Sequence, residues 1–206
     1  MTGPLGFVVG LAAEARIARR LGRVAIGGGM PQGAEAAAEL LVAQGVRGLV
    51  SFGLAGGLDP RLRPGDIVVP AQVRAGDTDF STAQFFGPAA GLLLAGDAIV
   101  ATRAGKANLF RQSGAGAIDL ESGAVARVAA RRNLPFAVLR AICDPAERDL
   151  PPAALSALDA RGAVGLWRVL LSIARQPTQI AGLMTLARDA ALARRALLRA
   201  ADQYMI

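Results

Sequence analysis

Residues 117–126 have the sequence AIDLESGAVA, in which a short apolar run ends in two acidic residues and continues into small residues. This pattern predicts a buried strand that ends near Asp119 and Glu121, followed directly by a helix. Residues 135–144, PFAVLRAICD, repeat the design with an apolar strand that ends at Asp144. Because strand ends meet at the edge of a sheet, we expect two neighbouring strands to direct these acids into one crevice.

Strand and helix patterns alternate through most of the chain. Apolar runs predict strands at 5–9, 23–27, 46–52, 66–73, 115–119 and 134–142, with extended segments at 92–94 and 99–100. Periodic or alanine-rich segments predict helices at 12–21, 31–44, 103–112 and 121–132, whereas residues 76–87 show no clear pattern. The alternation predicts an α/β fold, a single domain in which a mixed, mostly parallel twisted sheet is flanked by helices. Residues 1–150 are expected to form this core, and residues 151–206 a helical C-terminal extension of the same domain.

The composition excludes several kinds of chemistry. The sequence contains no histidine and one cysteine, Cys143, which excludes Ser-His-Asp triads, His-ligated metals and CxxC redox centres. Carboxylates must therefore carry any proton transfer, and no metal is expected. A lone cysteine favours a reducing compartment, and the sequence shows neither a signal-peptide pattern nor an apolar run of the ~18–20 residues that span a bilayer. We expect a cytoplasmic protein.

Three further segments precede the acidic strands in the chain: GLAGGL at 53–58, RPGDIVVP at 63–70 and GDA at 96–98. In this order, residues 5–147 resemble the nucleoside phosphorylase and nucleosidase superfamily, in particular the branch that cleaves methylthioadenosine and adenosylhomocysteine. Within that branch, residues 10–15 and the basic C-terminal segment are most similar to the hopanoid-associated phosphorylases.

The resemblance implies an enzyme, a purine nucleoside phosphorylase or nucleosidase that cleaves the N-glycosidic bond of a 5′-substituted adenosine and releases adenine. It implies adenosylhopane as substrate, and therefore a small-molecule nucleoside with a hydrophobic 5′ substituent as ligand. No cofactor is implied, although inorganic phosphate is a co-substrate if the cleavage is phosphorolytic. Two alternatives stay open, a methylthioadenosine or adenosylhomocysteine nucleosidase and a relative that binds a nucleoside or lipid without turnover. A homodimer is the expected assembly.

The resemblance also assigns roles to the acidic residues. It implies that Asp144 protonates the purine at N7, and partial burial beside Cys143 would favour this role by raising the pKa of the carboxyl group. Glu121 is implied to accept hydrogen bonds from the ribose 2′ and 3′ hydroxyls, with Leu120 packed under the sugar. From the residues alone, Asp144 is favoured as a strand-end aspartate that caps the next loop, and Glu121 is a helix N-terminal acid that interacts with the helix dipole. Asp119 is not assigned to the core of the site.

Glu14 is the candidate that orients an attacking water, but this assignment needs a shift of one residue. A gap-free count from Gly10 places Ala15 at the position that the family uses. The alternative for Glu14 is an exposed acid in the first turn of a helix. In the predicted glycine loop at 53–57, Ala55 and Gly56 are expected to contact base or sugar, and Ile99 and Cys143 to bind substrate beside them.

The acceptor of the ribosyl group stays open between phosphate and water. Family phosphorylases use a serine in the glycine loop to bind phosphate, whereas this chain has Leu54 there. The missing serine indicates water, while the similarity to hopanoid-associated phosphorylases indicates phosphate. Gly28, Arg16 and Thr102 are the candidate phosphate-binding residues, Gly28 through backbone amides.

The C-terminal segment combines positive charge with apolar surface. The chain carries a net charge of +7, and Arg161, Arg168 and Arg175 are spaced by seven residues on one helical stripe. Apolar residues around Trp167 fill much of the remaining surface. The segment is therefore predicted to pack on the core, to lie at a membrane interface, or to line an entrance for a hydrophobic substrate. Nucleic acid is not an expected partner, because no stacking aromatics are interleaved with the basic residues.

Overall fold

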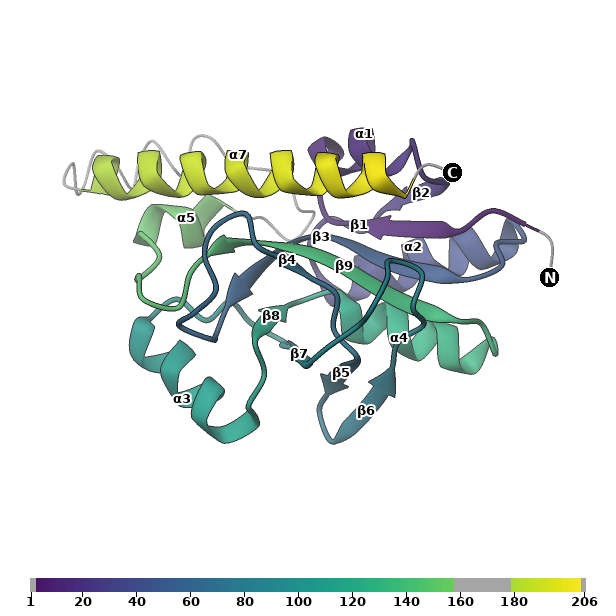
Figure 1. Cartoon of the computed structure of the whole chain (residues 1–206), viewed down its shortest axis with the longest axis horizontal. Coiled ribbons are helices and arrows are strands. Elements are labelled where there is room, and N and C mark those ends of the chain that lie inside the picture. The colour runs from purple at the N-terminus through teal and green to yellow at the C-terminus, as the bar shows by residue number, and fades with distance from the viewer. Residues whose placement is uncertain (1–2, 158–178, 205–206) are drawn as a thin grey trace.

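The computed structural model describes residues 3–157 and 179–204 of the chain (Figure 1). Their strands form one mixed sheet in the order β2-β1-β3-β8-β7-β5-β6, and β9 pairs with β3 and with β4. Five of the strand pairs are parallel and three, β3·β8, β4·β9 and β5·β6, are antiparallel. The predicted mixed, mostly parallel sheet is confirmed. The strands are β1 (Gly6–Val9), β2 (Arg23–Ile26), β3 (Leu49–Gly57), β4 (Ile67–Val68), β5 (Gln72–Ala75), β6 (Thr78–Ser81), β7 (Leu92–Ala95), β8 (Ala117–Asp119) and β9 (Phe136–Asp144).

Helices cover both faces of the sheet (Figure 1). On one face, α1 (Ala12–Ala18) and α7 (Ile180–Gln203) enclose a core with β1, β3 and β9 that includes Phe7, Phe52 and Leu197. On the other face, α2 (Pro31–Ala43) and α4 (Ser122–Arg131) pack through alanine-rich surfaces. Small side chains let these helices approach the strands closely. Two further helices, α3 (Arg103–Ser113) and α5 (Pro152–Ala157), lie near one end of the sheet.

The glycine-rich segment at 53–57 is a strand, and its prediction as a loop was wrong. It continues β3: residues 53–56 pair with β9, and Gly56 and Gly57 pair with β8. Glycine-rich sequence is typical of turns, but a buried strand accepts glycine where another group approaches its backbone closely. Gly53 shows this close approach, because a Cβ added there would lie 2.8 Å from Arg140 Nη1 and 2.8 Å from Glu14 Oε1.

The two acidic strands are not neighbours, since β3 lies between β8 and β9 and pairs with both. Three smaller predictions also change. The strand predicted at 66–73 is divided into β4 and β5 around Pro70, which has no N–H for a ladder. Residues 76–87 contain β6, and residues 99–100 belong to no strand.

The C-terminal helix α7 is fastened to the core at several points. The hydroxyl group of Tyr204 donates a hydrogen bond of 2.7 Å to the carbonyl oxygen of Phe86, and Asp202 forms an ion pair of 2.8 Å with Arg20. Asp189, in the same helix, pairs with Arg148 after β9. Within the described residues, no helix is long and apolar enough to cross a membrane. Residues 160–175, predicted to meet a membrane or a hydrophobic substrate, lie outside the described residues.

The close packing of α2 against the end of β2 gives a stability prediction. A Cβ added at Gly33 would lie 1.8 Å from the carbonyl oxygen of Gly27. We expect Gly33→Ala to lower the free energy of unfolding by roughly 1–3 kcal/mol, because overpacking outweighs the better helix propensity of alanine. Urea unfolding measures this change. Gln32→Ala, at the exposed neighbouring position, should alter stability by less than about 0.5 kcal/mol. Equal stability of the two variants would contradict the close contact.

Candidate active site

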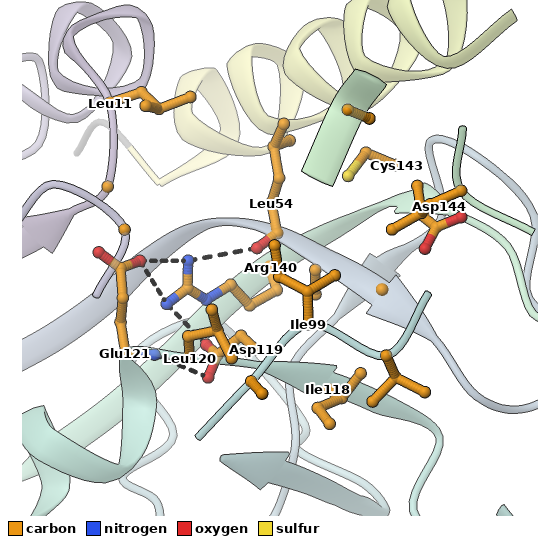
Figure 2. Close-up of a pocket in the computed structure, with 18 of the residues that line it drawn as sticks. Leu11, Leu54, Ile99, Ile118, Asp119, Leu120, Glu121, Arg140, Cys143 and Asp144 are labelled. Carbon is orange, nitrogen blue, oxygen red and sulfur yellow. Dashed lines mark hydrogen bonds and ion pairs between the residues drawn. The ribbon is translucent and has the colours of Figure 1, made fainter. Parts of the chain in front are cut away.

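A cavity of about 280 Å³ lies among the first turn of α1 and the ends of β3, β8 and β9. Its lining combines apolar side chains with charged groups that are otherwise buried (Figure 2). Eight of the candidate site residues line this one cavity: Glu14, Ala55, Gly56, Ile99, Leu120, Glu121, Cys143 and Asp144. The fold therefore collects residues that are far apart in the sequence.

Arg140 lies at the centre of the charged groups, with only 1% of its surface exposed. Its Nη2 forms an ion pair of 2.6 Å with Asp119 and donates a hydrogen bond of 2.6 Å to Ser51 Oγ. Both Nη atoms lie 3.2 Å from Glu121 Oε2. Arg140 was not predicted as a site residue, although it stands in the segment that ends at Asp144. Its partners come from β3, β8 and the start of α4, so sequence spacing alone could not identify them.

Asp119 belongs to the core of this charge cluster, contrary to its exclusion by the sequence prediction. Besides pairing with Arg140, it accepts hydrogen bonds from the backbone N–H and the hydroxyl of Ser122. These contacts fix the first turn of α4 to the end of β8. Asp119 also accepts a hydrogen bond from the backbone N–H of Glu121, the residue just before that helix, and therefore fixes the backbone there and holds Arg140 in place.

Glu121 has one occupied and one available oxygen. Its Oε2 accepts from Arg140, whereas Oε1 is buried and accepts no hydrogen bond from any residue between 3–157 or 179–204. Figure 2 shows the carboxylate beside Arg140 at one end of the cavity. Burial raises the pKa of Glu121 to about 7, against the opposing attraction of Arg140, and the nearby Glu14 and Asp119 charges raise it further. A buried acceptor without a partner is costly, so this oxygen is suited to a ligand hydroxyl.

Glu14 faces the cavity and is only 3% exposed, so the alternative of an exposed helix acid is wrong. Its Oε2 accepts from the backbone N–H groups of Gly10 and Leu11 at 2.9 Å, and its Oε1 accepts from Leu54 N at 3.2 Å. Burial raises the pKa of Glu14, while Arg140 and these backbone donors oppose the rise. A Cβ added at Gly10 would lie 3.3 Å from Glu121 Oε1 and 3.4 Å from Glu14 Oε2. The two carboxylates thus converge on one point.

Asp144 lies at the opposite end of the lining from Glu121 (Figure 2). It is 9% exposed, and its Oδ2 forms an ion pair of 2.7 Å with Lys106 Nζ. Burial raises the pKa of Asp144, as the sequence analysis expects, and the hydrogen bond from Lys106 opposes this rise. Burial also raises the pKa of the adjacent Cys143 to about 12, so the thiol is neutral near pH 7.

Lys106, from α3, is a cavity residue that the sequence patterns did not reveal. One signal could have identified it. Lys106 is the single lysine of a sequence with 23 lysine and arginine residues. A chain whose other basic side chains are all arginine has its one lysine ammonium group here, next to the acid that the resemblance singles out.

The three candidate phosphate-binding residues do not line the cavity. Gly28 lies outside, although its neighbour Gly29 is part of the lining. Arg16 is exposed, because it lies two positions from Glu14 and so on another face of α1. Thr102 caps α3 by accepting a hydrogen bond of 3.1 Å from Gly105 N. Among the described residues, no group of His, Cys, Asp and Glu side chains could hold a metal ion.

The raised pKa of Glu121 predicts how stability depends on pH. Between its ordinary value of 4.5 and about 7, the folded protein holds a proton that the unfolded chain releases. Stability should therefore fall as pH rises through this window, by at most about 1.4 kcal/mol per pH unit for this one group. No histidine titrates in the same range. Glu121→Gln should flatten the curve of unfolding free energy measured in urea from pH 5 to 7. Parallel curves for wild type and variant would contradict the raised pKa.

Comparisons with known proteins agree with this fold. The family model of the phosphorylase superfamily matches residues 20–92 and 88–163. A 5′-methylthioadenosine/S-adenosylhomocysteine nucleosidase from Colwellia psychrerythraea, solved with adenine, is 18% identical with a TM-score of 0.64, over 85% of this chain and 96% of that chain. Futalosine hydrolase of Helicobacter pylori is 16% identical with a TM-score of 0.66, over 98% of each chain.

A third similar structure is the 5′-methylthioadenosine/S-adenosylhomocysteine nucleosidase from Neisseria meningitidis in complex with methylthio-immucillin-A. It is 16% identical with a TM-score of 0.68, over 98% of this chain and 99% of that chain. At 16–18% identity, the solved structures show that the fold is shared. The family model shows the family, because it matches more than half of the sequence. The protein belongs to the phosphorylase superfamily, as the order of its sequence motifs predicts.

Proposed function

We propose that this protein is a nucleosidase that hydrolyses the N-glycosidic bond of a 5′-substituted adenosine and releases adenine. One observation carries the proposal: a single cavity holds Asp144 at one end and the converging carboxylates of Glu14 and Glu121 at the other. N-glycosidic cleavage needs a proton for the leaving base, an acceptor for the sugar hydroxyls and a group that orients the nucleophile. The cavity offers one carboxylate for each role.

At the base end, Asp144 supplies the proton. As the bond between C1′ and N9 breaks, its electron pair passes to the purine, and N7 takes the proton from the carboxyl group of Asp144. Burial supports this role because it raises the pKa of Asp144 and so increases the protonated fraction. The acid is left as a carboxylate beside Lys106.

At the sugar end, Glu121 Oε1 accepts from the ribose hydroxyls, and Arg140 holds the other oxygen of the same carboxylate. Glu14 accepts a hydrogen bond from the attacking water. The water oxygen bonds to C1′, and Glu14 takes up the released proton. The three backbone N–H groups that bind Glu14 fix the direction from which the water approaches.

Water fits this end of the cavity better than phosphate. Three acidic side chains, Glu14, Asp119 and Glu121, already share one guanidinium group, so an entering phosphate dianion would compete with them for Arg140. Leu54, which occupies the position of the family serine, already donates its backbone N–H to Glu14. The exposed Arg16 cannot compensate the charge from outside the cavity.

The lining also favours an apolar 5′ substituent. Leu11, Leu54, Leu150, Ala154 and Leu186 form an apolar part of the cavity wall, with Leu186 contributed by α7. In Figure 2, Leu11 and Leu54 point away from the charge cluster toward this helix. Burying a hydrocarbon substituent against these side chains contributes favourable free energy to binding. Adenosylhopane, the substrate that the sequence resemblance implies, carries a substituent of this kind, and a methylthio group is a smaller one.

The function is tested by chromatographic identification of products from 5′-methylthioadenosine and from a long-chain 5′-alkyl adenosine, each with and without phosphate. We expect adenine and a free ribosyl product in every case, with higher kcat/KM for the longer substituent. Asp144→Asn should slow adenine release by about 10²- to 10⁴-fold, because an amide cannot donate the proton.

Asp77→Asn makes the same chemical change at an exposed turn far along the chain from the cavity residues, and should retain wild-type turnover. Absence of adenine from both nucleosides would exclude the proposed reaction. A ribosyl phosphate that forms only when phosphate is present would show phosphorolysis and refute the proposed role of water.

A further inference from the structure

The side chain of Lys106 is fixed by three acceptors. It is 1% exposed, and its Nζ donates to the carbonyl oxygens of Pro145 at 3.0 Å and Arg148 at 2.9 Å, besides its ion pair of 2.7 Å with Asp144 Oδ2. An ammonium group has three N–H donors, and each has an acceptor here. The lysine therefore has one orientation, and that orientation places its charge on a single oxygen of Asp144.

The three acceptors around Nζ suit lysine better than arginine. An ammonium group is a compact charge with three donors, whereas a guanidinium group is planar, larger and arranged for bidentate contacts. The sequence otherwise uses arginine at every basic position, including the buried charge cluster at Arg140. The single exception lies where three acceptors converge on one point. Hydrogen bonds to the two backbone carbonyl groups alone would join α3 to the segment after β9. The third partner of Lys106 is a carboxylate that lines the cavity, which points to a role in the reaction.

We propose that Lys106 is a positioning residue for proton donation: it holds Oδ2 of Asp144, so that the acidic proton resides on Oδ1, and it stabilises the carboxylate formed when that proton leaves. This inference rests on the proposed function, because it concerns the proton that the leaving base receives. Lys106 itself neither gains nor loses a proton. The O–H bond at Oδ1 breaks, an N–H bond forms at N7, and the new negative charge lies against the ammonium group.

Other charged groups near Asp144 are already engaged. Arg148, in the segment after β9, pairs with Asp189 of α7, and both act on Asp144 only through space. Burial raises the pKa of the neighbouring Cys143 thiol, which is neutral near pH 7. The contacts of the described residues therefore leave Lys106 as the cation that touches this carboxylate.

The test compares two leaving groups in wild type and in Lys106→Gln, which retains hydrogen-bond donors without the charge. Adenine must be protonated to leave, whereas the 4-nitrophenolate of a 5′-matched 4-nitrophenyl riboside leaves without a proton. We expect kcat for the adenosine to fall by at least about 10-fold and kcat for the nitrophenyl riboside to stay within about 2-fold. The ratio of the two rates is insensitive to any loss of folded protein, because both substrates report on the same folded fraction.

Asp149→Asn is the matched control. Asp149 connects the same segment to the start of α3 by accepting a hydrogen bond of 2.6 Å from Arg103 N, and among the described residues its ion pair is with Arg103 and not with Lys106. This variant should leave both rates unchanged. A second measurement places Lys106→Gln in the Asp144→Asn background, where removal of the lysine should have no further effect on adenine release.

Equal losses on both leaving groups, or an undiminished effect of Lys106→Gln in the Asp144→Asn background, would overturn the inference and leave the proposed nucleosidase reaction intact. Failure of wild type to release adenine would instead refute the proposed reaction, and the inference with it.

Discussion

The ion pairs of a fully buried guanidinium group are the interaction on which the rest of the site depends. Arg140, on β9, contacts Ser51 on β3, Asp119 on β8 and Glu121 at the start of α4. Removing one partner from a buried charge pair typically costs about 3–5 kcal/mol, because the remaining charge stays without compensation. Here the charge of Arg140 is shared by three acidic side chains, Glu14, Asp119 and Glu121. The same contacts therefore hold the strands together and set the protonation of the acids.

The two ends of the cavity differ in electrostatics. At the proposed sugar end, Glu14, Asp119 and Glu121 share one cation, Arg140, and burial raises the pKa values of Glu14 and Glu121 against its attraction. Such an environment favours a substrate that develops positive charge, as an oxocarbenium-like sugar does, and disfavours an anionic nucleophile. At the base end, Lys106 pairs one to one with Asp144. In the proposed reaction, this difference matches the separate tasks of the acids that share the cavity.

Sequence patterns predicted the sheet type and most helices, because apolar runs and helix periodicity are local signals, and the resemblance to the superfamily supplied eight of the residues that line the cavity. They missed what depends on contacts between distant segments. Residues 53–57 look like a loop, yet Gly53 is a strand residue that makes room for Arg140. Counting from Gly10 could not decide between Glu14 and Ala15, since the decision lies in the backbone donors that bind the carboxylate. Lys106 is far from Asp144 in the sequence, and only its uniqueness marked it.

The central claim is that the available oxygen of Glu121 binds the ribose hydroxyls. The most direct measurement is kcat/KM of wild type and Glu121→Gln on an adenosine substrate and on its 2′-deoxy counterpart. We predict that the substitution impairs the ribonucleoside more than the deoxynucleoside, with a coupling free energy of about 0.5–3 kcal/mol. Equal impairment of both substrates would contradict the account, because Glu121 would then act on the structure and not on the sugar.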